Sequence, residues 1–135
     1  LIKKQFAASW KSTGGTPPKV AHIFKVIVPD KVFQVCKAYA HRVGNKRRRF
    51  HGTGRSPTCN FFLTLAGNPC YRSDCKTCSI CTKGFISPVN GKGIFSSATS
   101  SKADVYAHAS KQIHSDGQWY KSMFVCTVAA GHNIF

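Results

Sequence analysis

Apolar residues recur along this chain with two different periods, and together they predict both helices and strands. Spacings of three and four residues predict a helix over 5–12 and a second helix that opens at Pro29, with Asp30 as its N-cap. A short buried helix is expected over 60–66, and another from Thr99 or Ser100 to about 110. The apolar face of the second helix comprises Val32, Phe33, Val35, Cys36 and Tyr39.

Runs rich in Val, Ile and Phe predict strands over 20–28, 47–53 and 119–129, with a short strand over 92–97. A cysteine-bearing loop is expected over 67–83. Strands and helices joined by irregular connections favour an α+β fold over a regular parallel βαβ array. The length of 135 residues predicts a single domain.

The charge balance is strongly basic and favours a polyanionic partner. Twenty Lys and Arg oppose four Asp and no Glu, which gives a net charge of +16. Such an excess is typical of proteins that bind nucleic acid, although acidic proteins fit as well. A solvated edge strand, or acidic segments outside this sequence, would also account for it. The densest cluster consists of Lys46, Arg47, Arg48 and Arg49.

The chain has no segment that predicts a membrane or secretory destination. No apolar run approaches the ~20 residues of a membrane span, and the first residues form no signal region. The absence of a starting Met is typical of an excised domain. We therefore expect a nuclear or cytoplasmic protein.

Seven cysteines, an odd number, argue against a fully paired disulfide framework. Cys36 and Cys126 are interpreted as buried apolar residues. The run Cys70-x4-Cys75-x2-Cys78-x2-Cys81 predicts a structural zinc site, because Zn²⁺ prefers four thiolates brought together by short turns. Its first three cysteines also match a ferredoxin-like iron–sulfur spacing, and disulfides or free thiols remain alternatives. Cys59 or a histidine could replace one ligand.

Two further motifs lie in order, Phe50-His51-Gly52-Thr53 and Gly91-Lys92-Gly93-Ile94-Phe95, the latter followed by Ser101-Lys102-Ala103-Asp104-Val105-Tyr106. Together they resemble the NAD site of poly(ADP-ribose) polymerase-like ADP-ribosyltransferases. The cysteine-rich insertion at about 67–84 is similar to a fungal branch of those domains. The resemblance implies split antiparallel sheets flanked by short helices, in one catalytic domain over 1–135 that lacks its C-terminal strands.

The resemblance also assigns roles to the motif residues. His51 and Tyr106 would be the catalytic residues, with His51 bonding the 2′-hydroxyl of the nicotinamide ribose. The Gly52 backbone would pair with the carboxamide, while Tyr106 and Phe95 bracket the nicotinamide ring. Further cofactor contacts would come from Thr53 and Ala103, with Arg55 as a weaker candidate for the adenosine half and Lys102 near the reacting centre.

Two departures from the family pattern affect the expected activity. Ala103 stands where relatives commonly have a Ser that touches the carboxamide, which costs about 1 kcal/mol of binding. The family's catalytic Glu has no counterpart, since the chain contains no Glu. The resemblance therefore implies an NAD-dependent mono-ADP-ribosyltransferase acting on nucleic acid or protein. The alternative is a catalytically impaired module that binds nucleic acid, NAD or ADP-ribose. A zinc-dependent nucleic-acid-binding protein is a further alternative.

Overall fold

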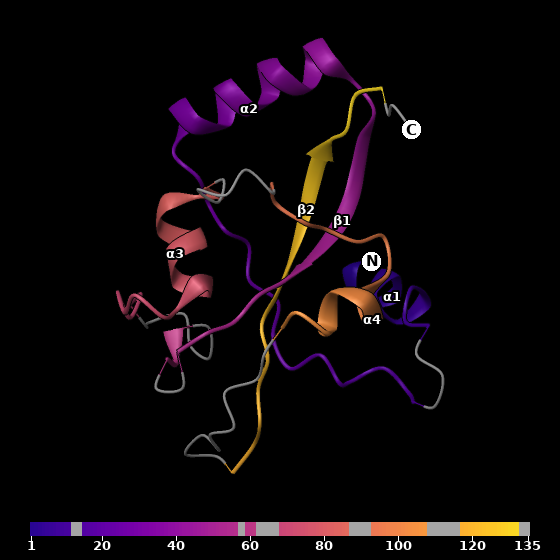
Figure 1. Cartoon of the computed structure of the whole chain (residues 1–135), viewed down its shortest axis with the longest axis vertical. Helices are drawn as coiled ribbons and strands as arrows, with labels where there is room; N and C mark the ends of the chain where they lie inside the picture. The colour runs from indigo at the N-terminus through magenta and orange to yellow at the C-terminus, as the bar shows by residue number, and fades with distance from the viewer. Residues whose placement is uncertain (12–14, 57–58, 62–67, 87–92, 108–116, 133–135) are drawn as a thin grey trace.

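The computed structural model describes residues 1–11, 15–56, 59–61, 68–86, 93–107 and 117–132. These residues form a small α+β fold around a two-stranded antiparallel sheet. Figure 1 shows the sheet in the middle, one helix across its upper end and helices on either side. The elements are α1 (Ile2–Ala8), α2 (Asp30–Val43), β1 (Lys46–Gly52), α3 (Lys76–Lys83), α4 (Ser100–Asp104) and β2 (Met123–Ala129).

Strand β1 lies between two neighbours. It pairs with β2 over its whole length, from Lys46 opposite Ala129 to Gly52 opposite Met123. On its other edge Phe50 exchanges two backbone hydrogen bonds with Ser97, at 2.7 and 2.9 Å. Phe50 is 1% exposed and therefore belongs to the small buried core.

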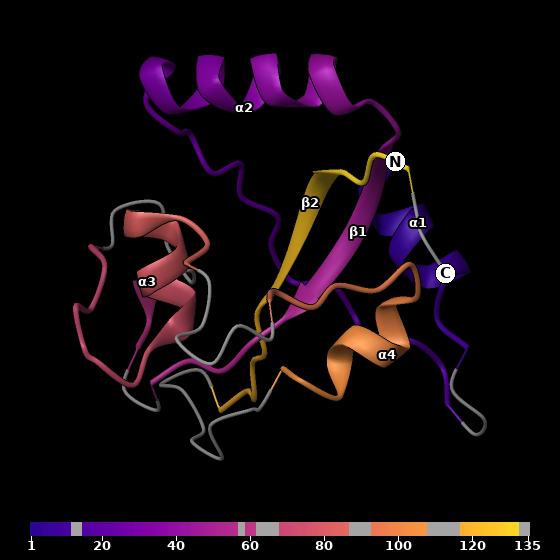
Figure 2. The ribbon, with the colours of Figure 1, turned by 45° about the horizontal axis from the view of Figure 1, so that its top comes forward.

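Helices α1 and α4 lie together beside β1, on the side away from β2 (Figure 2). The Phe6 ring meets the Phe50 ring edge-on, with centroids 6.2 Å apart. Ser100 donates through Oγ to the Phe6 carbonyl at 2.6 Å, and its backbone N–H bonds Ser9 Oγ at 3.1 Å. The free N–H at the start of α4 is thus satisfied by α1, which joins two segments far apart in the sequence.

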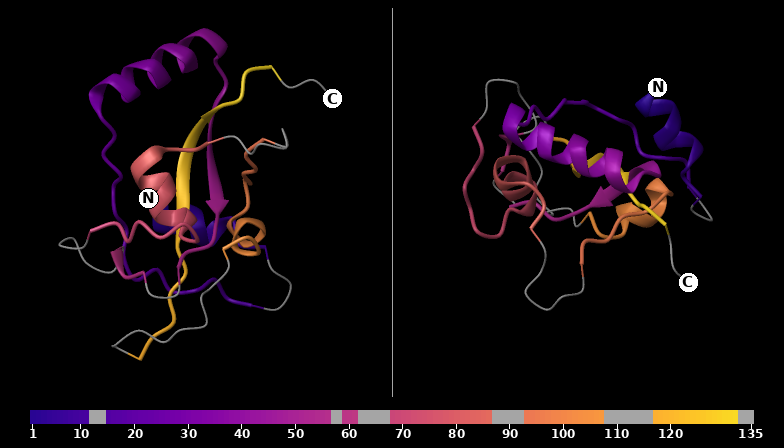
Figure 3. Two further views of the ribbon diagram at one scale, coloured as in Figure 1. Left: turned by 60° about the vertical axis from the view of Figure 1, so that its left-hand side comes forward. Right: turned by 90° about the horizontal axis from the view of Figure 1, so that it is seen from above.

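Helix α2 is formed as its sequence pattern predicts, but its apolar face is not covered by the described residues. Val35 is 66% exposed and Phe33 51%. Asp30 is the first helical residue and Pro29 the N-cap, so the predicted capping role of Asp30 is wrong. Its carboxylate still lies in the first turn, where its negative charge interacts favourably with the helix dipole. Figure 3 shows α2 crossing the end of the sheet where β1 begins.

The strand expected over 20–28 is not formed. Residues 15–29 have no regular secondary structure, and Ile27 is 85% exposed. A run of β-branched residues favours an extended chain, but a strand also needs a partner for its backbone groups. No described strand lies beside this segment, which explains the error.

The other elements agree with the sequence in place and differ in length. The first helix is Ile2–Ala8 rather than 5–12, and the long last strand is restricted to Met123–Ala129. The short strand expected over 92–97 reduces to one bridge, between Phe50 and Ser97. The helix expected from Ser100 to about 110 already ends at Asp104, and residues 105–107 form a turn. Residues 108–110, and residues 62–66 of the helix expected over 60–66, lie outside the described residues. No helix among the described residues combines the length and apolarity that a membrane crossing requires.

Candidate metal centre and nucleotide site

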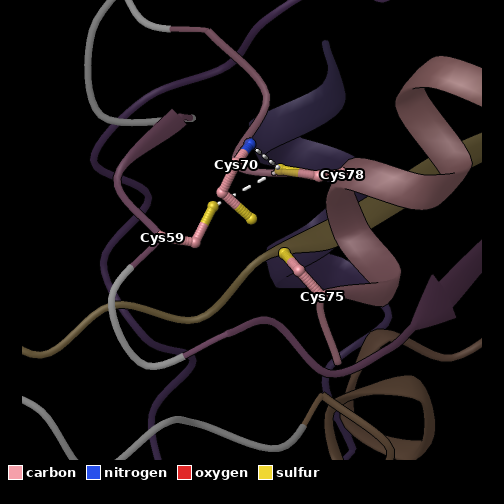
Figure 4. Close-up of side chains that lie close together, drawn as sticks. All are labelled: Cys59, Cys70, Cys75 and Cys78. Carbon is pink, nitrogen blue, oxygen red and sulfur yellow. Dashed lines mark hydrogen bonds between the residues drawn. The ribbon is translucent and has the colours of Figure 1, made fainter. Parts of the chain in front are cut away.

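Four cysteines converge beside helix α3. The sulfur atoms of Cys59, Cys70, Cys75 and Cys78 all lie within 4.8 Å of one another. Sγ of Cys59 and Cys78 are 3.4 Å apart, and the Cys70 backbone N–H points at Cys78 Sγ (Figure 4). Four thiolates at about 2.3 Å from a tetrahedral Zn²⁺ would be about 3.8 Å apart. The group therefore fits a single metal ion.

The structure changes one member of the predicted ligand set. Cys70, Cys75 and Cys78 are brought together as expected, but the fourth sulfur belongs to Cys59 and not to Cys81. Cys75 is the N-cap of α3 and Cys78 lies in its first turn, so the C-x2-C spacing places both thiols on one side of the helix. Cys81 lies one turn further along α3 and does not belong to this group.

The expected loop over 67–83 is also incorrect in its second half, which forms α3. Three of the thiols precede the helix: Cys59 in the chain that follows β1, Cys70 in the next loop, and Cys75 at the N-cap. One signal in the sequence could have indicated Cys59. A four-thiolate site needs four ligands, and a pair of cysteines in one helical turn supplies only two, so a second pair must come from another segment. All seven cysteines are free, and 3.4 Å between sulfurs is far longer than a disulfide bond.

Burial controls the ionisation of these thiols. It raises the pKa of Cys59 to about 11 and raises the pKa of Cys78 further. Burial also acts to raise the pKa of Cys75, but hydrogen bonds from the backbone of Ser56 and Cys78 outweigh it and lower that pKa. Cys59 and Cys78 therefore keep their protons in the absence of a cation, and a divalent ion would displace them.

Arg55 is enclosed by the cysteine loop. Its side chain is 5% exposed, and it donates to the Cys59 carbonyl at 2.9 Å and to the Tyr120 carbonyl at 2.9 Å. Burial lowers its pKa, whereas negative charge at Cys59 and Cys75 raises it. Four thiolates around a divalent ion would carry two net negative charges, which a buried guanidinium partly neutralises. Arg55 is therefore not available for the adenosine contact suggested by the sequence.

Helix α3 is tied to the ends of both strands. The Thr77 backbone N–H and hydroxyl both donate to the Gly54 carbonyl, at 3.1 Å and 3.2 Å. Thr77 Oγ1 is also 2.8 Å from Ser122 Oγ, just before β2. The metal centre consequently lies next to the strand ends that carry His51 and Gly52.

His51 is fixed at the end of β1 by a hydrogen bond and two rings. Its Nδ1 lies 2.6 Å from the Phe95 carbonyl oxygen. Because a carbonyl only accepts, Nδ1 carries the proton, which leaves Nε2 of the neutral ring as an acceptor. The Phe85 ring is edge-on to the imidazole at 5.0 Å, and Phe124 lies 6.5 Å away.

Gly52 occupies a place where the sheet pairing is interrupted. Alternate residues of a strand direct their backbone groups to opposite edges, so Gly52 points to the same edge as Phe50, toward Phe95. Among the described residues no backbone hydrogen bond joins Gly52 to Phe95. The Phe95 carbonyl is bonded to His51 instead. The N–H and C=O of Gly52 thus face this edge without a backbone partner in the described chain.

The remaining motif residues lie close to this edge. The carbonyl oxygen of Ala103 rests against the α-carbon of Gly52, and Tyr106 bonds back to that carbonyl through its N–H at 3.0 Å. The Tyr106 and Phe95 side chains are 56% and 69% exposed. Neither ring contacts another aromatic ring of the described chain, and Gly91 and Lys92 lie outside it. His51, Gly52, Phe95 and Ala103 are therefore in contact, with Tyr106 joined to them through the backbone.

Six further side chains were expected near the ligand or its acceptor. Thr53 is half-buried directly after β1, and Lys102 is exposed on α4. In the basic cluster Lys46, Arg47 and Arg48 are exposed and Arg49 is half-buried. Sequence reasoning missed Phe85 and Phe124. Phe124 lies directly opposite His51 in the register, so pairing the two predicted strands would have located it.

No protein-family model, curated protein or solved structure matches the chain.

Proposed function

We propose that this chain forms the nicotinamide-binding part of an NAD-dependent mono-ADP-ribosyltransferase. The observation that carries the proposal is the interrupted pairing at Gly52, whose N–H and C=O face the Phe95 edge while the Phe95 carbonyl is bonded to His51. A carboxamide carries one donor group and one acceptor. Its NH₂ group can therefore donate to the C=O of one residue while its oxygen accepts from the N–H of the same residue. The backbone of a neighbouring strand would make the same two hydrogen bonds.

The surrounding groups have suitable chemistry for the rest of the ligand. Nε2 of His51 would accept a hydrogen bond from a ribose hydroxyl. The exposed rings of Tyr106 and Phe95 offer flat surfaces to the nicotinamide, which is worth about 0.5–1.5 kcal/mol for a well-placed ring pair. In the transfer, the bond between the anomeric carbon and nicotinamide breaks with its electron pair leaving on nicotinamide. The acceptor nucleophile forms the new bond and releases a proton.

The decisive experiment measures nicotinamide release from NAD⁺ by the protein that contains this chain. His51→Ala and Tyr106→Ala are expected to abolish or strongly reduce release. His22→Ala and Tyr39→Ala are matched controls, because Tyr39 is 50% exposed and lies on α2. Release that persists in His51→Ala, or no detectable binding of NAD⁺ to the wild type, would refute the proposal.

The second candidate is a module that binds nucleic acid without transferring ADP-ribose. It is favoured by the lack of Glu, since a carboxylate stabilises the positive charge that develops on the ribose. A hollow of about 340 Å³ beside the start of β1 gives it a place, lined by Gln34, Lys37, Ala38, His41 and Lys46. Seven Lys and Arg and one Asp lie between positions 30 and 49. Both ion pairs of the described residues involve other side chains.

Salt-dependent binding of labelled RNA and duplex DNA tests this candidate. Each lost phosphate contact lowers the slope of log K against log salt by about 0.7 to 0.9. Lys37→Gln with Lys46→Gln should therefore reduce the slope by about 1.5. Lys76→Gln with Lys83→Gln, on exposed positions of α3, makes an equal charge change elsewhere. Equal reductions of the salt slope in the two double variants would show that only the total charge matters. Equal binding of polyglutamate would indicate an acidic protein partner.

We further propose that the ion held by the four cysteines is zinc in a structural role. All four ligands come from protein, and a closed site leaves no position for a reacting water. A cluster of several irons would hold its cysteines on different metals and so further apart than one ion does. Metal content of the purified protein decides between zinc and iron, and one zinc per chain is the expected result.

A further inference from the structure

We propose that the metal centre positions His51 through Phe85, so that the imidazole has one fixed orientation only when the four-cysteine group holds its ion. The inference concerns the state of a side chain, and its first test does not depend on NAD. Its consequence for ligand binding rests on the proposed function.

The first step is the dependence of α3 on the metal. Only Thr77 and Cys78 are buried in this helix of eight residues. A helix this short is not stable in water without tertiary contacts, and the one large apolar side chain of α3, Ile80, is only half-buried. Its fixed points are Cys75 and Cys78 in the metal group and the bonds of Thr77 to Gly54 and Ser122. An ion in the group would therefore join α3 to the segments that carry Cys59 and Cys70, in addition to the bonds of Thr77.

The second step is the path from the helix to the histidine. Helix α3 ends at Gly84, whose φ of 79° is a left-handed conformation that glycine adopts readily. The turn sends the chain back toward the sheet, and Phe85 follows at once. Its ring lies 5.0 Å from His51 at an interplanar angle of 88°, and 5.9 Å from Phe124 at 70°. Figures 1 and 3 place α3 beside the sheet, away from α4.

The third step is what Phe85 does for the imidazole. His51 is held by one hydrogen bond from Nδ1 to the Phe95 carbonyl, and one bond leaves the ring free to turn about it. Contact with Phe85 on one side and Phe124 nearby removes that freedom. Phe85 is 41% exposed, so part of its ring also reaches the surface beside His51. It is a positioning residue for His51.

The test is the NMR spectrum of the histidine ring protons in the zinc-loaded protein, with His51 assigned by His51→Ala. An aromatic ring at this distance displaces the resonances of the imidazole from those of exposed histidines. Phe85→Leu is expected to move the His51 resonances toward the exposed positions and to leave the zinc content unchanged. Chelation of the zinc should move them in the same direction.

The matched control is Phe24→Leu, because Phe24 stacks on His22 at 5.8 Å in a segment remote from α3 in the chain. It should move His22 and leave His51 in place. The proposal is overturned if His51 keeps its resonances in Phe85→Leu. It is equally overturned if chelation leaves them unchanged in a protein that stays folded by circular dichroism. If chelation unfolds the chain, the zinc-loaded Phe85→Leu spectrum alone decides.

NAD⁺ binding provides the second readout and separates the two proposals. Phe85→Leu should weaken NAD⁺ binding several-fold, whereas Phe85→Tyr, which keeps the ring, should restore both the resonance positions and the affinity. A wild-type protein that does not bind NAD⁺ sinks the proposed function but leaves the NMR test of Phe85 intact. Normal NAD⁺ affinity in Phe85→Leu with displaced His51 resonances would overturn the role of Phe85 in binding.

Discussion

The carbonyl oxygen of Ala103 occupies the place where a β-carbon of residue 52 would have to be. A β-carbon added to Gly52 would overlap that oxygen and lie 2.8 Å from the Ala103 carbonyl carbon. Both atoms belong to backbone, which cannot rotate away as a side chain can. The glycine is therefore required by the close approach of α4 to β1, in addition to any role in ligand binding.

Gly52→Ala should consequently destabilise the protein and separate α4 from β1. Overpacking of this kind costs about 1–3 kcal/mol, and the urea midpoint should fall accordingly. Gly54→Ala is the matched control, since nothing lies within 4 Å of its added β-carbon. Equal midpoints for the two variants would contradict the close approach seen here.

The ligand set of the metal centre makes a second prediction. Cys59→Ser removes a sulfur of the four-membered group and should reduce zinc content well below one ion per chain. Cys81→Ser should retain the full zinc content, because Cys81 lies outside the group. Zinc released on thiol oxidation, quantified with a chromogenic chelator, measures both. The opposite result would restore the ligand set that the sequence suggested.

The metal group shows how much of the site the sequence predicts and how much it does not. The spacing of Cys75 and Cys78 is local, so it located half of the metal group. The choice between Cys59 and Cys81 depends on how far along α3 Cys81 lies and on the path of the chain after β1. Neither is encoded in cysteine spacing alone.

The same division applies to the fold. Strands β1 and β2 and helix α2 follow periodic patterns that report the local backbone. Residues 20–28 have the composition of a strand but lack a neighbour, and strand formation is a property of a pair. Phe85 could not be linked to His51 from the sequence, because the contact depends on the turn at Gly84.

Arg55 provides a third prediction. Arg55→Gln should destabilise the protein by about 1–3 kcal/mol, because the Cys59 and Tyr120 carbonyls lose buried donors. It should also weaken zinc binding by removing a positive charge next to the thiolates. Arg72→Gln is the control for a lost arginine, since its ion pair with Asp74 is 57% exposed on both sides and of little energetic value. Comparable stability of the two variants in urea would contradict the stabilising role of the Arg55 hydrogen bonds.

Cys126 and Cys36 allow a prediction on reactivity and pH. Burial raises the pKa of Cys126 to about 11. Cys36 lies exposed on α2, so its interpretation as a buried apolar residue is wrong. With its pKa raised to about 11, the Cys126 thiol is almost wholly protonated at pH 8, whereas the exposed Cys36 sulfur is open to reagents. Iodoacetamide should therefore modify Cys36 long before Cys126, as followed by mass spectrometry of peptides.

The sign of the stability effect follows from the same shift. The folded-state pKa of Cys126 is raised, so its contribution to the free energy of unfolding is fully present below about pH 9. It is lost as the pH rises toward 11, because the unfolded chain then releases the proton more readily. Cys126→Ala, which has no thiol to ionise, should lose less stability than the wild type between pH 9 and 11. Identical slopes in that window, measured by urea unfolding, would mean that the Cys126 thiol is not held protonated by burial in β2.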